Sequence, residues 1–212
     1  TLWALGSRVR HVTGAERLRA MDGPFVAALT HSQRTEAFLV PALLAWMRGG
    51  RIIRFLADWN FMLLPPVYVL YRCAHVIPVT AKPARPRFLT PLKRLIAPSK
   101  SSLHRSRQCL ARSQPVGLFV EGTTNRDPTR LLHGRRGAVR LALDASVPIL
   151  PIGIRFPDHA SPAEPVGDAE PLSVHVGHPI QPPSQVPIST VHARVMRAIA
   201  RLSGMAWSSD RD

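Results

Sequence analysis

The chain has 212 residues, enough for one domain with a substantial core and too few for two well-separated domains. Its 28 lysine and arginine residues outnumber 13 acidic ones, and the formal charge of +15 attracts nucleic acid, anionic lipid or acidic proteins alike. The 2 cysteines, Cys73 and Cys109, exclude a disulfide scaffold and a cysteine metal knuckle, so a reducing, cytoplasmic setting is expected.

Short apolar runs of strand length alternate with longer segments of helical period along the chain. Strands are predicted at 25–30, 52–57, 76–79, 116–120, 148–154 and 172–176. Helices are predicted at 37–47, 61–71, 101–112, 137–145 and 191–202. This alternation favours an α/β sheet with helices packed on its faces.

Two proline-rich stretches, 82–98 and 156–171, are predicted to be surface loops within the domain. No run reaches the roughly 18 uncharged apolar residues that a membrane-spanning helix needs. The nearest candidate, 55–73, contains Asp58, Asn60 and a double proline, so it is expected to reach a membrane surface at most. Because the chain starts without a methionine, an upstream anchor or targeting segment stays open.

The stretch "ALTHSQRTEAFLV" places His31 and Glu36 five positions apart, between two apolar runs. Within one helix this spacing would put them about 140° apart, so they could not meet. A turn after the strand would bring the carboxylate to one ring nitrogen and leave the other free to take a proton. The alternative to a catalytic pair is that the two residues are unrelated. His31 would then simply end a strand, and Glu36 would lie in the first turn of a helix, where the helix dipole favours negative charge. The residues alone leave both interpretations open.

A second polar cluster, "EGTTNR" from Glu121 to Arg126, follows the strand predicted at 116–120. Glycine lets backbone N–H groups approach a ligand, and hydroxyls and an arginine donate hydrogen bonds, a combination that suits a phosphate. Thr123 stands where a P-loop needs lysine, so that motif is not favoured. An ordinary strand-to-helix turn would also use Gly, Thr and Asn. Glu121 favours a site, since a carboxylate at the core edge needs a partner.

Other catalytic patterns are missing from the sequence. It contains no G-x-S-x-G elbow, no H-E-x-x-H and no glycine fingerprint of a dinucleotide site after a strand. His175 and His178 have metal-ligand spacing but no third ligand nearby, so no metal site is expected.

Four stretches, taken in order, resemble the glycerophosphate and lysophospholipid acyltransferase family. They are "THSQRTE" (30–36), "HVIPVTAK" (75–82), "LFVEGTTNR" (118–126) and "GRRGAVRLALDASVPILPIGIR" (134–155). The family carries H-x-x-x-x-D after a strand, then a block like "IPVDR", then "FPEGTRS", then a helix and a strand like "VPIIPV". The resemblance implies a single acyltransferase domain over 1–212 with a mixed sheet flanked by helices. Its motif-bearing core would span about 11–180, and a C-terminal helix about 188–204.

The chain departs from the family pattern at positions that bear on activity. Glu36 replaces aspartate, which moves the carboxylate by about the length of one C–C bond. Ala81 stands at the family's arginine position in the second stretch, with Lys82 beside it as a substitute. Thr124 replaces arginine in the third stretch, which leaves Arg126 to supply the charge. We therefore expect phosphate recognition to be weakened, re-aimed or replaced by a different acceptor.

The resemblance implies a membrane-associated enzyme that moves a fatty acyl group from acyl-CoA or acyl-carrier protein to a hydroxyl of a lysophospholipid or glycerophosphate-type acceptor. His31 would be the general base, oriented by Glu36. The residues expected to hold the acceptor are Lys82, Glu121, Gly122, Thr123, Thr124 and Arg126. No cofactor is expected besides the acyl donor as co-substrate, and no metal.

The resemblance and the charge together suggest where the protein works. An anionic membrane surface and an acidic carrier protein would both be attracted by the positive field. We expect the cytoplasmic face of the membrane, with the protein bound peripherally or anchored by a segment outside this chain.

Two other hypotheses stay open. The altered residues at 36, 81 and 124 are compatible with a degenerate family member that binds lipid or acyl carrier without catalysis. The net charge alone suggests a nucleic-acid binder, but the arginines are scattered, aromatic residues make up only 6% of the chain, and no recognition motif is present. No nucleic-acid partner is therefore expected.

Overall fold

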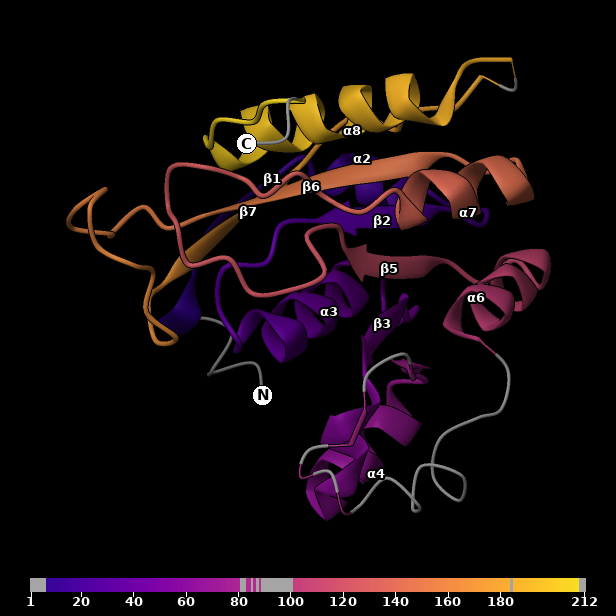
Figure 1. Ribbon diagram of the computed structural model, residues 1–212, viewed down its shortest axis with the longest axis horizontal. Coiled ribbons are helices and arrows are strands. Elements are labelled where there is room, and N and C mark those ends of the chain that lie inside the picture. Colours follow the sequence, from indigo (N-terminus) through magenta and orange to yellow (C-terminus); the bar gives the residue numbers. More distant parts are fainter. Residues whose placement is uncertain are drawn as a thin grey trace.

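The structure is a computed structural model that describes residues 7–80, 83–84, 86, 88, 101–183 and 185–209. A seven-stranded sheet lies at the centre of these residues, in the order β1-β7-β6-β2-β5-β3-β4 (Figure 1). The strands are β1 (Val9–Thr13), β2 (Val26–Leu29), β3 (Arg54–Asp58), β4 (Ile77–Val79), β5 (Val116–Phe119), β6 (Ile149–Arg155) and β7 (Leu172–Val176). β2 to β6 run parallel to one another, whereas β7 is antiparallel to β6 and β1 is parallel to β7. The sheet is therefore mixed, as predicted.

Helices cover both faces of this sheet. They are α2 (Ala15–Arg19), α3 (Glu36–Met47), α4 (Pro65–Cys73), α6 (Ser102–Ala111), α7 (Gly137–Ala145) and α8 (Ile188–Ser203), with the 3-10 helix η1 (Trp59–Leu63) before α4. The helices α6, α7 and α8 contribute to the hydrophobic core on one face, and α2 and α3 to the core on the other. Figure 1 shows α4 at the end of the molecule away from α8. The predicted α/β sheet flanked by helices is confirmed.

The central strand β2 shows how the two cores are divided. Its four residues are all buried. Val26 and Ala28 belong to the core under α7 and α8, whereas Ala27 and Leu29 belong to the core under α3. Side chains of a strand alternate between its faces, so a strand buried on both faces reads as a continuous apolar run. This explains why the sequence predicts β2 clearly.

The elements β1 and α2 lie outside the predicted ones. β1 is an edge strand beside β7, and three of its five residues are exposed, so its sequence has no apolar run. α2 has five residues, which is too short to show a helical period. The helix predicted at 61–71 is divided into η1 and α4, because Pro65 and Pro66 take the first positions of α4, where a missing N–H costs no hydrogen bond.

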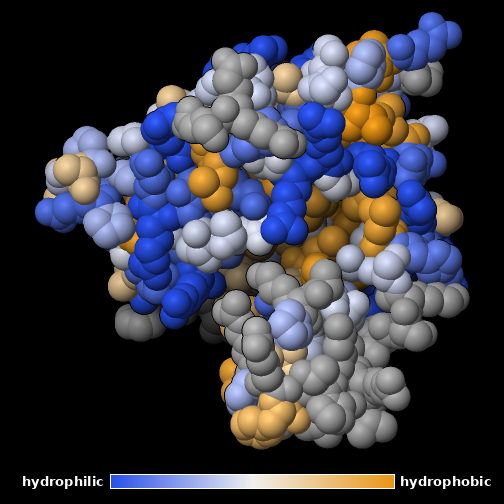
Figure 2. Space-filling view, viewed as in Figure 1, coloured by the Kyte–Doolittle hydropathy of each residue, from blue (hydrophilic) through white to orange (hydrophobic). Residues whose placement is uncertain are grey.

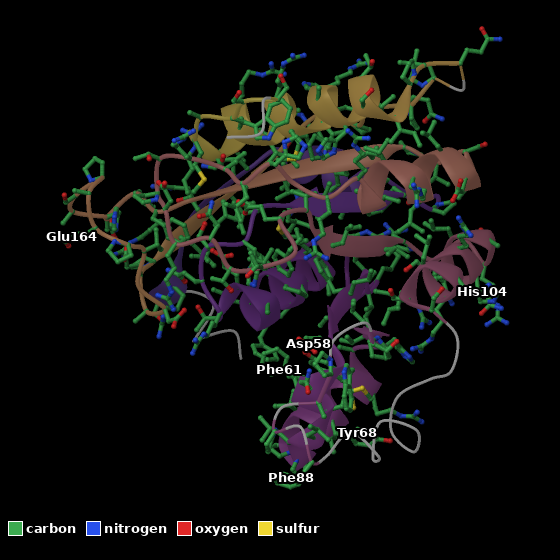
Figure 3. All side chains as sticks on the ribbon, viewed as in Figure 1. Asp58, Phe61, Tyr68, Phe88, His104 and Glu164 are labelled. Carbon is green, nitrogen blue, oxygen red and sulfur yellow. The ribbon has the colours of Figure 1, made fainter. Side chains whose placement is uncertain are left out.

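Residues 59–73 form a small lobe, which we call the η1–α4 lobe. Trp59, Met62 and Tyr71 form its core. Its surface carries exposed apolar side chains with 38% to 60% of their area accessible, namely Phe61, Leu64, Tyr68, Val69 and Leu70. Figure 3 labels two of them, and Figure 2 shows apolar side chains at the outer end of this part of the molecule. Over the described residues, every helix is too short or too polar to cross a bilayer.

Gly117 in β5 provides a test of the packing beneath the carboxyl ends of the strands. It pairs with Phe55 of β3, and a Cβ at Gly117 would lie 2.6 Å from the Phe55 ring. We expect Gly117→Ala to lower the free energy of unfolding by about 1–3 kcal/mol through overpacking, as measured by urea denaturation. Gly23→Ala is the matched control, because no atom lies within 4 Å of the added Cβ. Equal stability of the two variants would contradict this account.

Candidate functional site

The carboxyl ends of β2 and β5 meet at the candidate site. These strands are parallel neighbours, with Leu29 paired to Phe119. Two residues beyond that pair, the chain reaches His31 on one side and Glu121 on the other. The N–H of His31 donates to Oε2 of Glu121 over 3.0 Å, across 90 residues of sequence. Ligands of open α/β sheets bind at this end of the strands.

His31 and Glu36 contact each other through the turn between β2 and α3. Glu36 is the first residue of α3, and its Oε2 lies 3.2 Å from Nδ1 of His31. The N–H of Ser32 donates to the same oxygen over 2.8 Å. Charge-assisted N–H···O bonds are usually about 2.7–2.9 Å long, so the glutamate reaches the histidine through a comparatively long bond. The turn therefore brings the predicted pair together.

The hydrogen bonds at Glu36 determine which nitrogen of His31 carries a hydrogen. An ionised carboxylate can only accept hydrogen bonds, so opposite an ionised Glu36 the donor is Nδ1 of His31. In the neutral ring Nε2 is then an acceptor, and it lies 3.2 Å from Oγ1 of Thr124. The His31 side chain is 15% exposed. Its basic nitrogen can therefore be reached by a hydroxyl group.

Glu36 is fully buried, with 0% of its side chain exposed. Burial raises its pKa above the ordinary value of 4.5. The hydrogen bond and charge of His31, together with the N–H groups of Ser32 and Gln33, act in the opposite direction. The charge on this carboxylate therefore depends on the contacts within its own turn.

The ring of His31 stacks on Phe119, with ring centroids 4.3 Å apart and an interplanar angle of 30°. Phe119 in turn contacts Phe55, at a centroid distance of 5.7 Å. Phe55 can lie over β5 because Gly117 has no side chain. The plane of the histidine ring is thus supported from the core of the α3 face.

Glu121 connects three segments of the chain. Its Oε2 accepts from the N–H of His31, and its Oε1 accepts from the N–H of Leu132 over 2.9 Å and from Nδ2 of Asn125 over 2.8 Å. The N–H of Asn125 also donates to the carbonyl of His31 over 2.7 Å. Burial raises the pKa of Glu121, and these hydrogen bonds act against it. The carboxylate positions the loop around His31, and its contact with an acceptor stays a prediction.

Arg126 is held by the loop between β6 and β7, which spans residues 156–171. Its guanidinium donates to the carboxylate of Asp168 and, over 2.7 Å, to the carbonyl of Val166. The N–H of Val166 donates to the carbonyl of Arg126 over 2.8 Å. The positive charge of Arg126, which the sequence predicted to bind an acceptor, is therefore balanced by Asp168. Binding of an acceptor by Arg126 stays a prediction.

The same β6–β7 loop holds the turn that contains His31 and Glu36. The N–H of Arg34 donates to the Asp168 carboxylate over 2.9 Å, and Oγ1 of Thr35 donates to the Asp168 carbonyl over 2.9 Å. Nε2 of Gln33 donates to the carbonyl of Glu170 over 3.0 Å. The stretch predicted only as a surface loop therefore fixes three consecutive residues of the turn.

Gly122 and Thr123, two other predicted binding residues, precede Thr124 in the chain. Gly122 has φ +70, and its missing side chain leaves room for Arg135, which lies directly against it. Thr123 is exposed beside them. Lys82 lies outside the described residues. Sequence reasoning missed Arg135, which brings a second guanidinium to this stretch.

Three further residues of the site were not predicted as site residues. Asn125 stands inside the "EGTTNR" stretch, so its place in the motif was an available signal. Phe119 could have been found from strand register, since it precedes Glu121 by two and shares its face. Asp168 has no local signal, because its role depends only on how the β6–β7 loop folds back.

The chemistry that this arrangement offers is proton transfer at Nε2 of His31. The buried carboxylate of Glu36 orients the ring and balances the charge that a proton would bring. In the part of the chain that the structure describes, no group of three or more His, Cys, Asp or Glu residues is placed to hold a metal ion.

Comparisons with known proteins agree with the fold. A family model described as Acyltransferase matches residues 9–155, which include all four motif stretches. The structure is similar to the crystal structure of the 1-acyl-sn-glycerophosphate (LPA) acyltransferase PlsC from Thermotoga maritima, with a TM-score of 0.67 and 17% sequence identity. The match covers 98% of this chain and 78% of that chain. No curated protein matches this chain significantly in sequence.

Asp168→Ala tests the role of the β6–β7 loop. The variant loses the acceptor of the Arg34 N–H and the ionic partner of Arg126. We expect amide exchange at residues 33–36 to become about tenfold faster in native-state hydrogen–deuterium exchange, since one or two hydrogen bonds are lost. Asp158→Ala is the control, because it lies in the same loop and pairs with Arg10 instead. Identical amide exchange at residues 33–36 in both variants would contradict the role of Asp168 in holding this turn.

The effect of Asp168 should depend on pH. The hydrogen bond from Arg34 and the contact with Arg126 hold the pKa of Asp168 below its ordinary value of 3.8. A carboxylate with a lowered pKa stabilises the fold above its unfolded pKa, and this is lost as the pH falls through the folded pKa. The difference in the free energy of unfolding between wild type and Asp168→Ala should therefore be present above pH 3.8 and vanish on acidification.

Glu36→Gln tests the cost of the buried charge. Because burial raises the pKa of Glu36, stability that is present below its ordinary pKa of 4.5 is lost as the pH rises through the folded pKa. Relative to wild type, we expect the free energy of unfolding of Glu36→Gln to increase between pH 4 and pH 8 in urea titrations. Glu16→Gln, at a side chain that is 70% exposed, should show no such trend. A pH-independent difference for Glu36→Gln would refute the assignment.

Proposed function

This chain belongs to the acyltransferase family, and on that basis we propose that it moves a fatty acyl group from a thioester donor to a hydroxyl of a lysophospholipid or glycerophosphate-type acceptor. The donor is acyl-CoA or acyl-carrier protein. One observation carries the proposal: Nδ1 of His31 is held by Glu36, while Nε2 lies 3.2 Å from a hydroxyl oxygen. An acceptor hydroxyl in that place would meet a base that is already oriented.

In the proposed step, Nε2 of His31 takes the proton of the acceptor hydroxyl as its oxygen attacks the carbonyl carbon of the thioester. Glu36 balances the charge of the imidazolium that forms. The tetrahedral intermediate then collapses, the C–S bond breaks, and the departing thiolate takes the proton back from Nε2. The products are the acylated acceptor and the free thiol, and no acyl-enzyme is formed.

Thr124 indicates where the acceptor would lie. Its hydroxyl occupies the hydrogen-bonding position at Nε2, so an acceptor hydroxyl would displace it or share that position. Thr123 and Gly122 precede it in the chain, and Arg135 lies against Gly122, which supports binding of a polar or anionic headgroup there. Lys82 and Arg126 remain in the proposed set as sequence-based expectations.

We propose that the enzyme works at the cytoplasmic face of a membrane, bound peripherally or anchored from outside this chain. The exposed apolar side chains of the η1–α4 lobe support this, because such side chains favour the interface of a bilayer (Figure 2). The net charge of +15 would add attraction to anionic lipid. An acyl acceptor embedded in that surface would then be close to the protein.

A second candidate function is lipid or acyl-carrier binding without catalysis. The specific observation in its favour is that Thr124 replaces the family's arginine, while Arg126 is occupied by Asp168. The long contact between His31 and Glu36 also favours it. Consumption of a thioester by the purified protein separates the two candidates.

His31→Ala tests the base. Since a general base contributes about 10² to 10⁴ in rate, we expect acyl transfer to fall by that factor while the circular dichroism spectrum is unchanged. His104→Ala is the control, since His104 is exposed on α6 (Figure 3). Near-full activity of His31→Ala would refute the mechanism.

The substrate is tested by mass spectrometry of products after incubation with a mixed lysolipid extract and an isotopically labelled acyl-CoA or acyl-carrier protein. Label should appear in one class of acylated lipid and be lost in His31→Ala. If the wild-type protein transfers no label but Glu36→Asp does, the non-catalytic candidate is correct.

A further inference from the structure

A cavity of about 510 Å³ lies near the carboxyl end of β6, and none of the predicted site residues that the structure describes lines it. It is lined by residues of β1, β6, β7, the C-terminal end of α8 and two loops. Ser173 and His175 point to the α8 face of the sheet, because Leu172, Val174 and Val176 occupy the α3 face. His31 stacks on Phe119, which belongs to the α3 face. The cavity and the proposed base are therefore on opposite faces.

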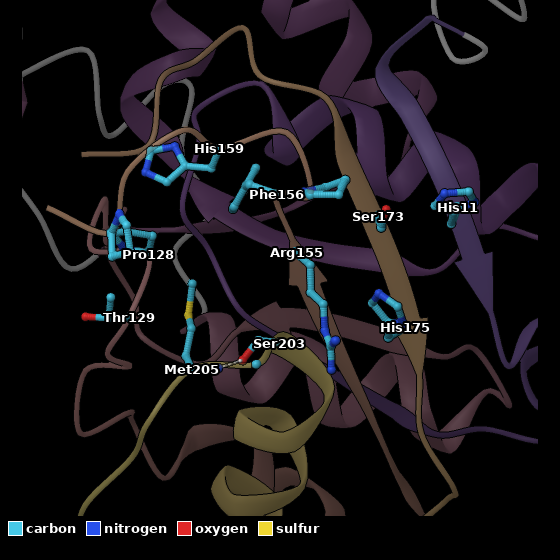
Figure 4. Close-up of a pocket in the computed structure, with 13 residues that line it drawn as sticks. His11, Pro128, Thr129, Arg155, Phe156, His159, Ser173, His175, Ser203 and Met205 are labelled. Carbon is cyan, nitrogen blue, oxygen red and sulfur yellow. Dashed lines mark hydrogen bonds between the residues drawn. The ribbon is translucent and has the colours of Figure 1, made fainter. Parts of the chain in front are cut away.

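The cavity wall carries positive and titratable groups but no carboxylate. Arg155, His11, His159 and His175 line it, and none of its described lining residues is Asp or Glu. Figure 4 shows Arg155 in the middle of the site, with His175 on one side and Ser203 on the other. Its volume is in the usual range for a site that binds a small molecule, about 300–1,000 Å³.

Arg155 and His175 are held in place by neutral groups. The guanidinium donates to the carbonyls of Leu202 and Arg201, over 2.7 and 2.9 Å, at the end of α8. Nδ1 of His175 contacts Oγ1 of Thr13 at 2.8 Å, which leaves Nε2 for another partner. Burial and the charges of Arg155 and His11 lower the pKa of His175, as expected where positive charge gathers without a counter-ion.

Three acidic residues adjoin or contact residues of the cavity wall, and each has other partners. Asp127 accepts from the N–H and from Oγ1 of Thr129, both over 2.7 Å. Asp158 accepts from Arg10 over 2.8 Å. Glu170 contacts Nδ1 of His159 at 2.8 Å, and this hydrogen bond raises the pKa of His159. The hydrogen bonds of Arg155 go to carbonyl oxygens, and none of these three carboxylates forms an ion pair with it.

Ser173 also lines the cavity, and its buried hydroxyl has no partner among the described residues. Ser173 is only 3% exposed, and its Oγ forms no hydrogen bond to any described residue. Buried hydroxyls normally have a partner, which a ligand or water can supply. The rest of the wall is largely apolar and includes Phe156 and Met205. These features select a ligand with a charged end and an apolar part.

We propose that this cavity is a second binding site, which takes a phosphate or carboxylate attached to a small apolar group, with Arg155, His175 and Ser173 around the anion. Among the described residues, no group of three or more His, Cys, Asp or Glu could hold a metal ion, so the proposed ligand of these histidines is an anion. The anion is either a soluble metabolite or a lipid headgroup. A ligand here would contact the β6–β7 loop through Phe156, and that loop holds the turn of His31.

The test uses the full chain and histidine ring signals in two-dimensional NMR, titrated with inorganic phosphate and with hexyl phosphate. We expect both anions to shift the signals of His175 and His11, and hexyl phosphate to bind about tenfold more tightly because methylene groups are buried. His175→Gln should weaken binding at least tenfold. His178→Gln is the matched control, because His178 is exposed outside the cavity.

Each other outcome overturns the proposal. Equal shifts at the exposed His104 and His178 would mean general attraction of anions to a basic surface. Shifts confined to His31 would place the anion at the proposed active site, which would support the proposed function while refuting this one. Equal affinity for both anions would mean that the site binds phosphate alone and has no place for an apolar group, which contradicts the proposal. Because no acyl donor is present, the result is independent of whether the protein transfers acyl groups.

Discussion

The carboxylate of Glu121 accepts hydrogen bonds from the backbone of His31 and of Leu132, and so it joins the end of β2 to the loop after β5. A buried carboxylate is costly unless its oxygens find donors. Here two of the donors are backbone groups, and the position of the His31 N–H follows from the pairing of Leu29 with Phe119. The register of two neighbouring strands therefore decides where the histidine ring lies. Phe119, which belongs to the same residue pair, stacks on that ring.

Much of this fold could be predicted because the central strands are buried on both faces. β2 and β6 read as continuous apolar runs, whereas the edge strand β1 mixes exposed polar residues with half-buried ones and gives no such signal. The contact between His31 and Glu36 was predictable because it is local and depends on one turn. The role of Asp168 was not, since it comes from a loop that returns to the turn after 133 residues.

Charge is distributed differently from what the motifs suggest. Arg126 belongs to the motif, yet Asp168 neutralises it, while Arg135 lies against Gly122. Arg155 caps the end of α8 and has no acidic partner among the described residues. The β6–β7 loop holds Arg126 through Val166 and Asp168, and its Phe156 lines the same cavity as Arg155. A motif gives the residue types present, but tertiary pairing decides which charges are available to a ligand.

The parallel pairing of β2 with β5 has a consequence for how such a protein can vary. Between these neighbours the chain leaves the centre and builds β3, η1, α4 and β4 at one border of the sheet. The residues of η1 and α4 take no part in the pairing of β2 with β5, so changes confined to them leave the register that aligns His31 with Glu121 intact. The exposed apolar side chains of the η1–α4 lobe and the contacts that hold His31 thus come from separate stretches of the sequence. Selection can therefore adapt the protein to another environment without rebuilding its site.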